Sequence, residues 1–104
     1  MYRPAVPAYI VAINQINDPE VFAEYLTAGR ASMAGFDGLR VVGSSNPVEV
    51  LDGVAPHPRC VVLEFPDMET ARAWYHSPAY QAAAQKRFAA SDGFVILVDG
   101  ATPS

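Results

Sequence analysis

The sequence has few of the residues that build covalent cross-links, metal sites or nucleic-acid surfaces. It contains one cysteine, Cys60, and two histidines. One cysteine excludes an internal disulfide, and these residues form no ligand pair at zinc-finger or zinc-ribbon spacing, so we expect no metal. Only 7 lysines and arginines accompany 11 aspartates and glutamates, which gives a net charge of −4. This balance argues against a phosphate-binding surface and therefore against nucleic acid as a partner.

Long apolar runs and an export signal are also missing. The longest apolar stretches have the length of a strand, far below the ~20 residues of a membrane helix. The N-terminal MYRPAVPAYIV has no apolar h-region and no small-residue cleavage site, so we expect no membrane partner and a cytoplasmic location. The chain does have 51% hydrophobic against 17% charged residues, enough for a core. Its length predicts one domain over residues 1–104, with loose tails at 1–7 and 101–104.

β-Branched and aromatic residues gather in short runs that predict strands. Asp18-Pro19 signals the start of a first helix, because the aspartate accepts from free N–H groups of the first turn and proline needs none at the first helical position. A second helix begins at Pro66-Asp67 and is broken at Ser77-Pro78, since the residue before a proline avoids the α region. Turns at 35–38 and 92–93 end the two helices. The predicted strands are 9–16, 39–43 with a continuation at 48–51, 59–65, and 94–98.

The resulting order is β-α-β-β-α-β, which is typical of an α+β, ferredoxin-like fold with two helices on one face of an antiparallel sheet. Such a sheet alternates apolar and polar residues when its other face meets water. Here both rows are apolar, as in Val61/Leu63/Phe65 and Cys60/Val62. Exposing one row would forgo roughly 1.5–3 kcal/mol for each large side chain. We therefore expect a homodimer in which a second copy covers the face without helices.

The run RCVVLEFPDMETARAWYHSPAYQ, with NDPEVFAEY, VEVLDG and FVILVDG elsewhere, resembles the small bacterial family of domains of unknown function numbered thirteen-thirty. The sequence departs from that family in having His76 where asparagine is usual, and in a longer SSNP interruption. The resemblance implies a dimeric α/β barrel, in which two sheets pack face to face. The wider superfamily includes cofactor-free monooxygenases, muconolactone-type isomerases, polyketide cyclases and haem enzymes, and the fold alone does not choose among them.

His76, Tyr75 and Tyr80 are the candidate catalytic residues. They lie around the predicted helix break, where a histidine beside a phenol could move protons on an enolisable substrate. The alternative is a helix-end histidine that interacts with terminal carbonyls and water.

Arg59, Glu64, Trp74 and Arg87 are the candidate ligand-binding residues. Glu64 lies in the middle of an apolar strand and needs a partner or a raised pKa, so we predict an ion pair with Arg40, with a general base as the alternative. Trp74 belongs to an aromatic set that forms either the core or the wall of an apolar pocket. Arg59 and Arg87 match positions that are commonly arginine in the family that this sequence resembles. They could bind a substrate carboxylate or make dimer and helix-to-loop contacts.

Two functional hypotheses follow. The first is a cofactor-independent enzyme of isomerase, cyclase or monooxygenase type, acting on a small hydrophobic or aromatic compound. The second is a non-catalytic dimer that binds a small ligand or serves as an accessory protein, since the sequence carries no triad, metal set or phosphate loop. Haem binding through His76 has weaker support, because a helix break already accounts for that residue. We expect no cofactor.

Overall fold

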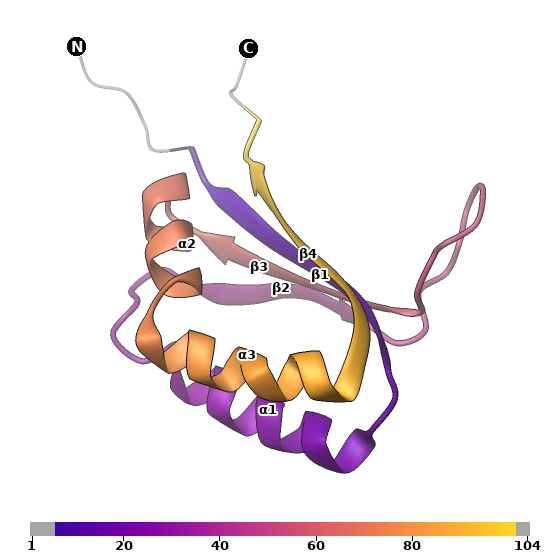
Figure 1. The fold of residues 1–104 in the computed structure, drawn as a ribbon. Coiled ribbons are helices and arrows are strands. Elements are labelled where there is room, and N and C mark those ends of the chain that lie inside the picture. Colours follow the sequence, from indigo (N-terminus) through magenta and orange to yellow (C-terminus); the bar gives the residue numbers. More distant parts are fainter. Residues whose placement is uncertain (1–5, 102–104) are drawn as a thin grey trace.

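The computed structural model describes residues 6–101 of the chain. Within them a four-stranded antiparallel sheet, in the order β2-β3-β1-β4, carries the helices on one face (Figure 1). The predicted α+β fold with its ferredoxin-like β-α-β-β-α-β order is confirmed, the second helix being divided in two. The elements are β1 (Ala8–Ile16), α1 (Pro19–Ala31), β2 (Arg40–Ser45), β3 (Arg59–Phe65), α2 (Met68–Tyr75), α3 (Pro78–Ala90) and β4 (Ser91–Asp99).

Short polar side chains begin each helix. The Asp18 carboxylate accepts from the Val21 N–H at 3.2 Å, and Pro19 follows at the first position of α1. The Asp67 carboxylate accepts from the Thr70 N–H at 2.7 Å at the start of α2. Ser77 caps α3 while the helical hydrogen bonds of α2 end before Pro78, which has no N–H to donate. The predicted break at Ser77-Pro78 is thus confirmed, and it lets α2 and α3 take different directions over the sheet (Figure 1).

Two predicted segments are wrong. Residues 48–51 do not continue the sheet; residues 46–58 leave it as a projecting arm between β2 and β3 (Figure 1). Pro47 lacks the N–H that a ladder position would donate, which favours leaving the sheet there. Asp92-Gly93 forms no turn but pairs with β1 inside β4. Gly93 is required for close approach instead, because a Cβ there would lie 2.1 Å from the Ile13 carbonyl oxygen.

Both faces of the sheet are apolar, but the helices cover only one of them. On the helix side Ile10, Leu63 and Phe65 are buried against the helices. On the other side, which we call the helix-free face, Phe94, Ile96 and Val98 remain 42%, 45% and 41% exposed. The two-sided apolar pattern read from the sequence is therefore present in the structure, and the single chain leaves one apolar face uncovered.

The 46–58 arm and the chain ends lie at the periphery. At the arm, Leu51 and Val54 are 90% and 95% exposed, while the ring of His57 lies 6.5 Å from that of Phe94 on the helix-free face. The predicted loose tails fall mostly outside the described residues. Within those described, the Gly100 N–H donates to the Pro7 carbonyl at 2.7 Å, so the chain is tied there. No helix within residues 6–101 has the length and apolar character needed to cross a membrane.

Candidate functional site

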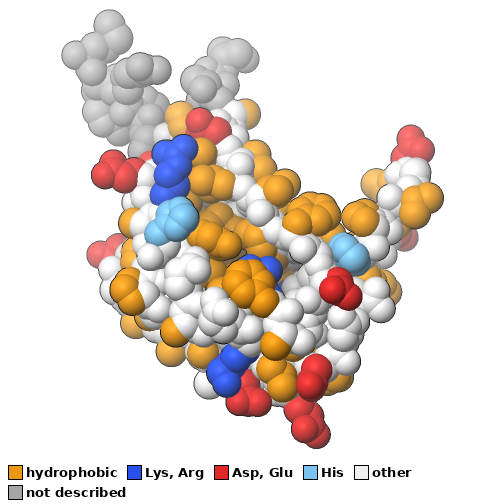
Figure 2. Space-filling model, in the orientation of Figure 1, with side chains coloured by type: hydrophobic (Ala, Val, Ile, Leu, Met, Phe, Trp, Pro, Cys, Tyr) orange, Lys and Arg blue, Asp and Glu red, His pale blue; other side chains and the backbone are white. Residues whose placement is uncertain are grey.

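A cavity of about 370 Å³ lies between α1 and the helix side of the sheet; we call it the α1 cavity. It exists because α1 packs mainly on α3 and makes few contacts with the strands. In the space-filling view, hydrophobic side chains surround a hollow between the helices and the sheet, with basic atoms inside it (Figure 2). Apolar side chains dominate the cavity lining, among them Ile10, Leu26, Met33, Val41, Val61, Leu63 and Val95.

One wall of the α1 cavity is aromatic and rigidly held. Trp74 of α2 and Tyr80 of α3 are buried, with ring centroids 4.1 Å apart. The Trp74 indole N–H donates to the Ser32 hydroxyl at 3.1 Å, and that hydroxyl donates to the Gly29 carbonyl of α1. These hydrogen bonds fix the indole plane, so the wall is formed before any ligand arrives.

Two phenols place a polar group on this wall. The hydroxyl oxygens of Tyr25 and Tyr80 lie 3.0 Å apart. Burial raises the pKa of Tyr25 above its ordinary value and the Tyr80 hydroxyl adds to the shift, while the charges of Arg87 and Arg59 oppose it. Tyr25 is therefore protonated at neutral pH. Because a hydrogen bond uses one hydroxyl hydrogen, the accepting hydroxyl of the pair keeps its own hydrogen for a third group.

Arg59 brings a positive charge into the same cavity from the first residue of β3. Its guanidinium donates to the Asn14 side-chain oxygen at 3.2 Å and lies 4.8 Å above the Phe22 ring. Burial lowers the pKa of Arg59, because a less solvated site disfavours the charged form.

Arg87 of α3 is 6% exposed, and its guanidinium lies 4.7 Å from the Phe88 ring. Its Nε has no hydrogen-bond partner, and neither has Nδ2 of Asn14, which is 2% exposed. The ion pairs formed within residues 6–101 involve other cations, so neither Arg59 nor Arg87 has a carboxylate partner in that part of the chain.

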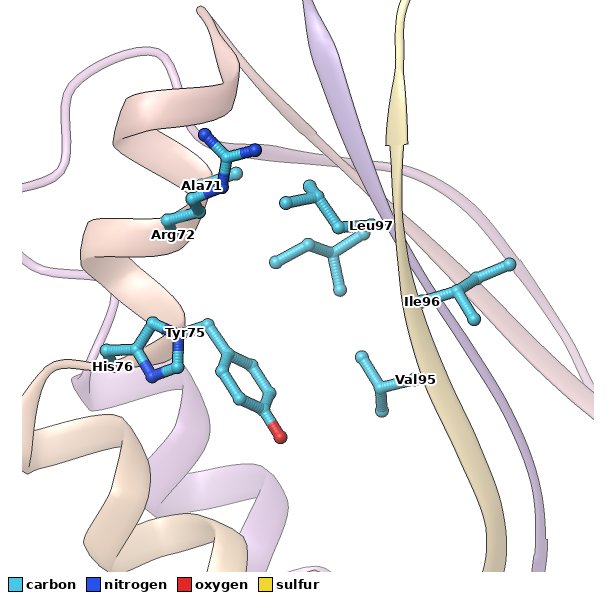
Figure 3. Close-up of a pocket in the computed structure, with 8 residues that line it drawn as sticks. Ala71, Arg72, Tyr75, His76, Val95, Ile96 and Leu97 are labelled. Atoms are coloured by element: carbon cyan, nitrogen blue, oxygen red, sulfur yellow. The ribbon is translucent and has the colours of Figure 1, made fainter.

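A second opening, the α2–β4 cleft, holds about 280 Å³. Tyr75 points from α2 into the space in front of β4, and His76 lies at its edge (Figure 3). The Tyr75 and His76 rings meet at right angles with centroids 5.3 Å apart. His76 is exposed, and its N–H ends α2 by donating to the Arg72 carbonyl. Ile10 and Val95 line both openings, so the two meet over the same part of the sheet.

The structure distributes the three candidate catalytic residues over two openings. The rings of Tyr75 and Tyr80 lie 5.4 Å apart, but the Tyr80 hydroxyl pairs with Tyr25 in the α1 cavity while His76 lines only the α2–β4 cleft. The structure therefore does not bring all three side chains to one opening.

The candidate ligand-binding residues are also separated. Trp74 and Arg59 line the α1 cavity. Glu64 lies on the helix-free face, with its carboxylate 2.7 Å from the Arg40 guanidinium and accepting from the Tyr9 hydroxyl at 3.2 Å. The predicted Arg40–Glu64 pair is confirmed.

Sequence reasoning missed two polar residues beside the cavity, Asn14 and Ser32. Asn14 carried a readable signal, since an amide inside the apolar run YIVAINQI must find a partner if it is buried. Ser32 gave no such signal, because a serine just after a helix is ordinary in sequence. Within residues 6–101 no group of three or more acidic, histidine or cysteine side chains is placed to hold a metal ion.

Comparison with known proteins gives a family and a fold. The model of the family described as "Domain of unknown function (DUF1330)" matches residues 7–101. No curated protein matches the chain.

Solved structures of the same fold match at low identity. A protein of unknown function from Rhodopseudomonas palustris aligns with a TM-score of 0.75 at 18% identity, covering 95% of this chain and 85% of that one. SnoaB, a cofactor-independent oxygenase from Streptomyces nogalater, aligns with a TM-score of 0.66 at 16% identity, covering 95% and 97%. A dimeric ferredoxin-like protein of unknown function from Thermobifida fusca aligns with a TM-score of 0.63 at 16% identity, covering 95% of each chain.

Proposed function

The chain belongs to the family described as "Domain of unknown function (DUF1330)", and because that membership assigns no reaction, we propose from the geometry that the protein binds a small aromatic compound in the α1 cavity. The observation that carries the proposal is the preformed wall of Trp74 and Tyr80 facing an apolar floor. A volume of about 370 Å³ lies at the small end of the range for ligand pockets. Flat aromatic surfaces stack favourably on such a wall.

We also propose that the working unit is a homodimer in which a second copy covers the helix-free face. Phe94, Ile96 and Val98 support this, because each exposes a large apolar side chain on one continuous surface. The Thermobifida fusca protein of the same fold is described as dimeric. Size-exclusion chromatography with light scattering should give about twice the 11.2 kDa of one chain. A stable interface should bury more than ~1,200 Å² in total.

Fluorescence of Trp74 tests the binding proposal directly, since it is the chain's one tryptophan and lines the cavity. Titration with 2-naphthol should change the emission saturably. Val61→Phe places a ring in the cavity and should abolish the change, whereas Val50→Phe on the exposed arm should leave it intact. An unchanged emission in the wild-type protein up to millimolar 2-naphthol would remove the proposal.

A second candidate function is cofactor-independent catalysis on an enolisable compound. It draws on the likeness to SnoaB and on the His76–Tyr75 pair at the α2–β4 cleft. Removal of a proton from carbon is a step that isomerases, cyclases and cofactor-independent oxygenases can share, and it needs a positioned base. The alternative is a protein that binds its ligand without reaction.

Exchange of the α-hydrogens of 2-tetralone in D₂O, followed by NMR, separates catalysis from simple binding. If His76 is the base, His76→Ala should lower the exchange rate while the melting temperature stays the same. Loss in Tyr80→Phe alone would move the chemistry to the α1 cavity. Binding of 2-tetralone without hydrogen exchange would contradict catalysis and favour a protein that binds its ligand without reaction.

A further inference from the structure

The α1 cavity is bordered by hydrogen-bond donors without matching acceptors. Arg59 lines the cavity and uses one of its five N–H groups on Asn14. The Nδ2 of Asn14 also has no partner, but it is fully buried next to Arg59 and does not line the cavity. One hydroxyl hydrogen of the Tyr25–Tyr80 pair is free. A set of donors of this kind is complementary to an oxygen-rich, electron-rich ligand group.

The same region carries positive charge that the described part of the chain leaves unneutralised. Arg59 is half-buried and Arg87 is 6% exposed. Their neighbours are an amide and two aromatic rings, with no carboxylate in ion-pair contact within residues 6–101. Both charges act on the Tyr25 phenol, which lines the cavity.

Burying a cation without a counter-ion costs free energy, and the cost falls when an anion arrives. The chain has a surplus of acidic residues, 11 against 7 basic ones, yet none pairs with these two arginines in the described residues. A purely structural role for Arg59 accounts for its bond to Asn14 but not for a charge kept beside an apolar cavity.

We propose that the ligand of the α1 cavity is an aromatic carboxylate, with its ring on the Trp74–Tyr80 wall and its carboxylate on the Arg59 guanidinium. This inference rests on the binding function proposed above and adds the substrate class. The planar guanidinium fork matches a carboxylate in a two-point contact. Apart from Arg59 and the exposed Arg30, the lining is neutral and mostly apolar, which suits a hydrocarbon ring system.

The test compares two compounds of nearly equal shape, 2-naphthoate and 2-naphthamide, by titration calorimetry. The wild-type protein should bind the carboxylate about tenfold more tightly than the amide, since a hydrogen bond to a charged group exceeds a neutral one by a factor of that order. Arg59→Met should bind both compounds with the amide's affinity. Lys86→Met, which removes a cation outside both openings, should leave the preference unchanged.

Two outcomes overturn the inference while sparing the binding function: equal affinities in the wild-type protein, or a preference that survives in Arg59→Met. Binding of neither compound would instead contradict the binding function itself. If Arg59→Met does not fold, Arg59→Lys keeps the charge but loses the two-point contact. It should then retain only part of the preference, and a full preference would count against the guanidinium contact.

Discussion

Gly29 lowers the stability of helix α1 but leaves space in the α1 cavity. It lies inside α1, where glycine is less favourable than alanine by roughly 1 kcal/mol. A Cβ there would lie 3.7 Å from the Tyr25 ring, an ordinary contact, and would project into the cavity that Gly29 lines. The sequence could not reveal this, because a single glycine in a helical pattern does not show which way its missing side chain would point.

Replacing Gly29 should therefore separate stability from binding. We expect Gly29→Ala to raise the free energy of unfolding by up to ~1 kcal/mol in urea titrations and to weaken 2-naphthol binding, because the methyl group narrows the cavity. Thr27→Ala on the exposed side of α1 is the control and should leave affinity unchanged. Full affinity in Gly29→Ala would mean that the ligand does not approach this part of α1.

The Arg40–Glu64 pair gives a second residue-scale prediction. The Arg40 side chain is 70% exposed and that of Glu64 21%, so water screens the pair in a single chain. Glu64→Gln should then cost only ~0.2–1 kcal/mol of unfolding free energy. A larger loss that grows with protein concentration would indicate that a second copy covers this pair, because both residues belong to the helix-free face.

Among the elements, helix starts were readable from sequence and sheet edges were not. Asp18 and Ser77 act through the backbone of the next turn, so four consecutive residues contain the information. The predicted continuation of the second strand at 48–51 is wrong, because strand pairing depends on a partner strand far along the chain. The predicted turn at Asp92-Gly93 is wrong for the same reason, since the close approach of the β1 backbone, and not a turn, requires glycine there.

The cap of α2 predicts a pH dependence. Hydrogen bonds from Thr70 hold the pKa of Asp67 below its ordinary value near 3.8. A carboxyl with a lower pKa in the folded state stabilises the fold above its unfolded pKa, and this contribution is lost as pH falls through the folded pKa.

Asp67→Asn keeps a capping oxygen but removes the charge. The wild-type protein should exceed this variant in unfolding free energy above about pH 4, and the two should converge in more acidic solution. Urea titrations across pH check this, with Asp52→Asn on the exposed arm as the control. A constant difference at every pH would show that the charge contributes nothing.

For the whole molecule, the apolar residues on both faces of the sheet predict a dimer from the sequence alone. The strand sequences show two apolar faces, and the helices can cover only one of them. The cavity could not be anticipated in the same way. It depends on how far α1 stands from the sheet, and helix-to-sheet distance is set by packing across many residues. Arg59 and Trp74 line the cavity, whereas Glu64 is five residues beyond Arg59 on β3 and therefore lies on the helix-free face.

A charge on the helix-free face should separate the proposed subunits. Val98 is 41% exposed in the single chain, so Val98→Glu should leave the fold intact while an unpaired carboxylate becomes costly to bury in an interface. Light scattering should then report a monomer of 11.2 kDa. Ala82→Glu on the exposed side of α3 adds the same charge elsewhere and should remain dimeric. A dimeric Val98→Glu protein would place the interface on another surface.

The 46–58 arm is a segment where the chain can be lengthened without disturbing the sheet. Ser45 and Cys60 are paired across β2 and β3, so the arm leaves and re-enters the sheet about one strand spacing apart, ~4.8 Å. Its length can change with only a slowly varying entropy of loop closure, because each doubling of a loop costs ~0.6 kcal/mol. The arm is therefore a graft site: a peptide tag or a small folded insert placed between Leu51 and Val54 would hang from the molecule without entering the sheet or the α1 cavity.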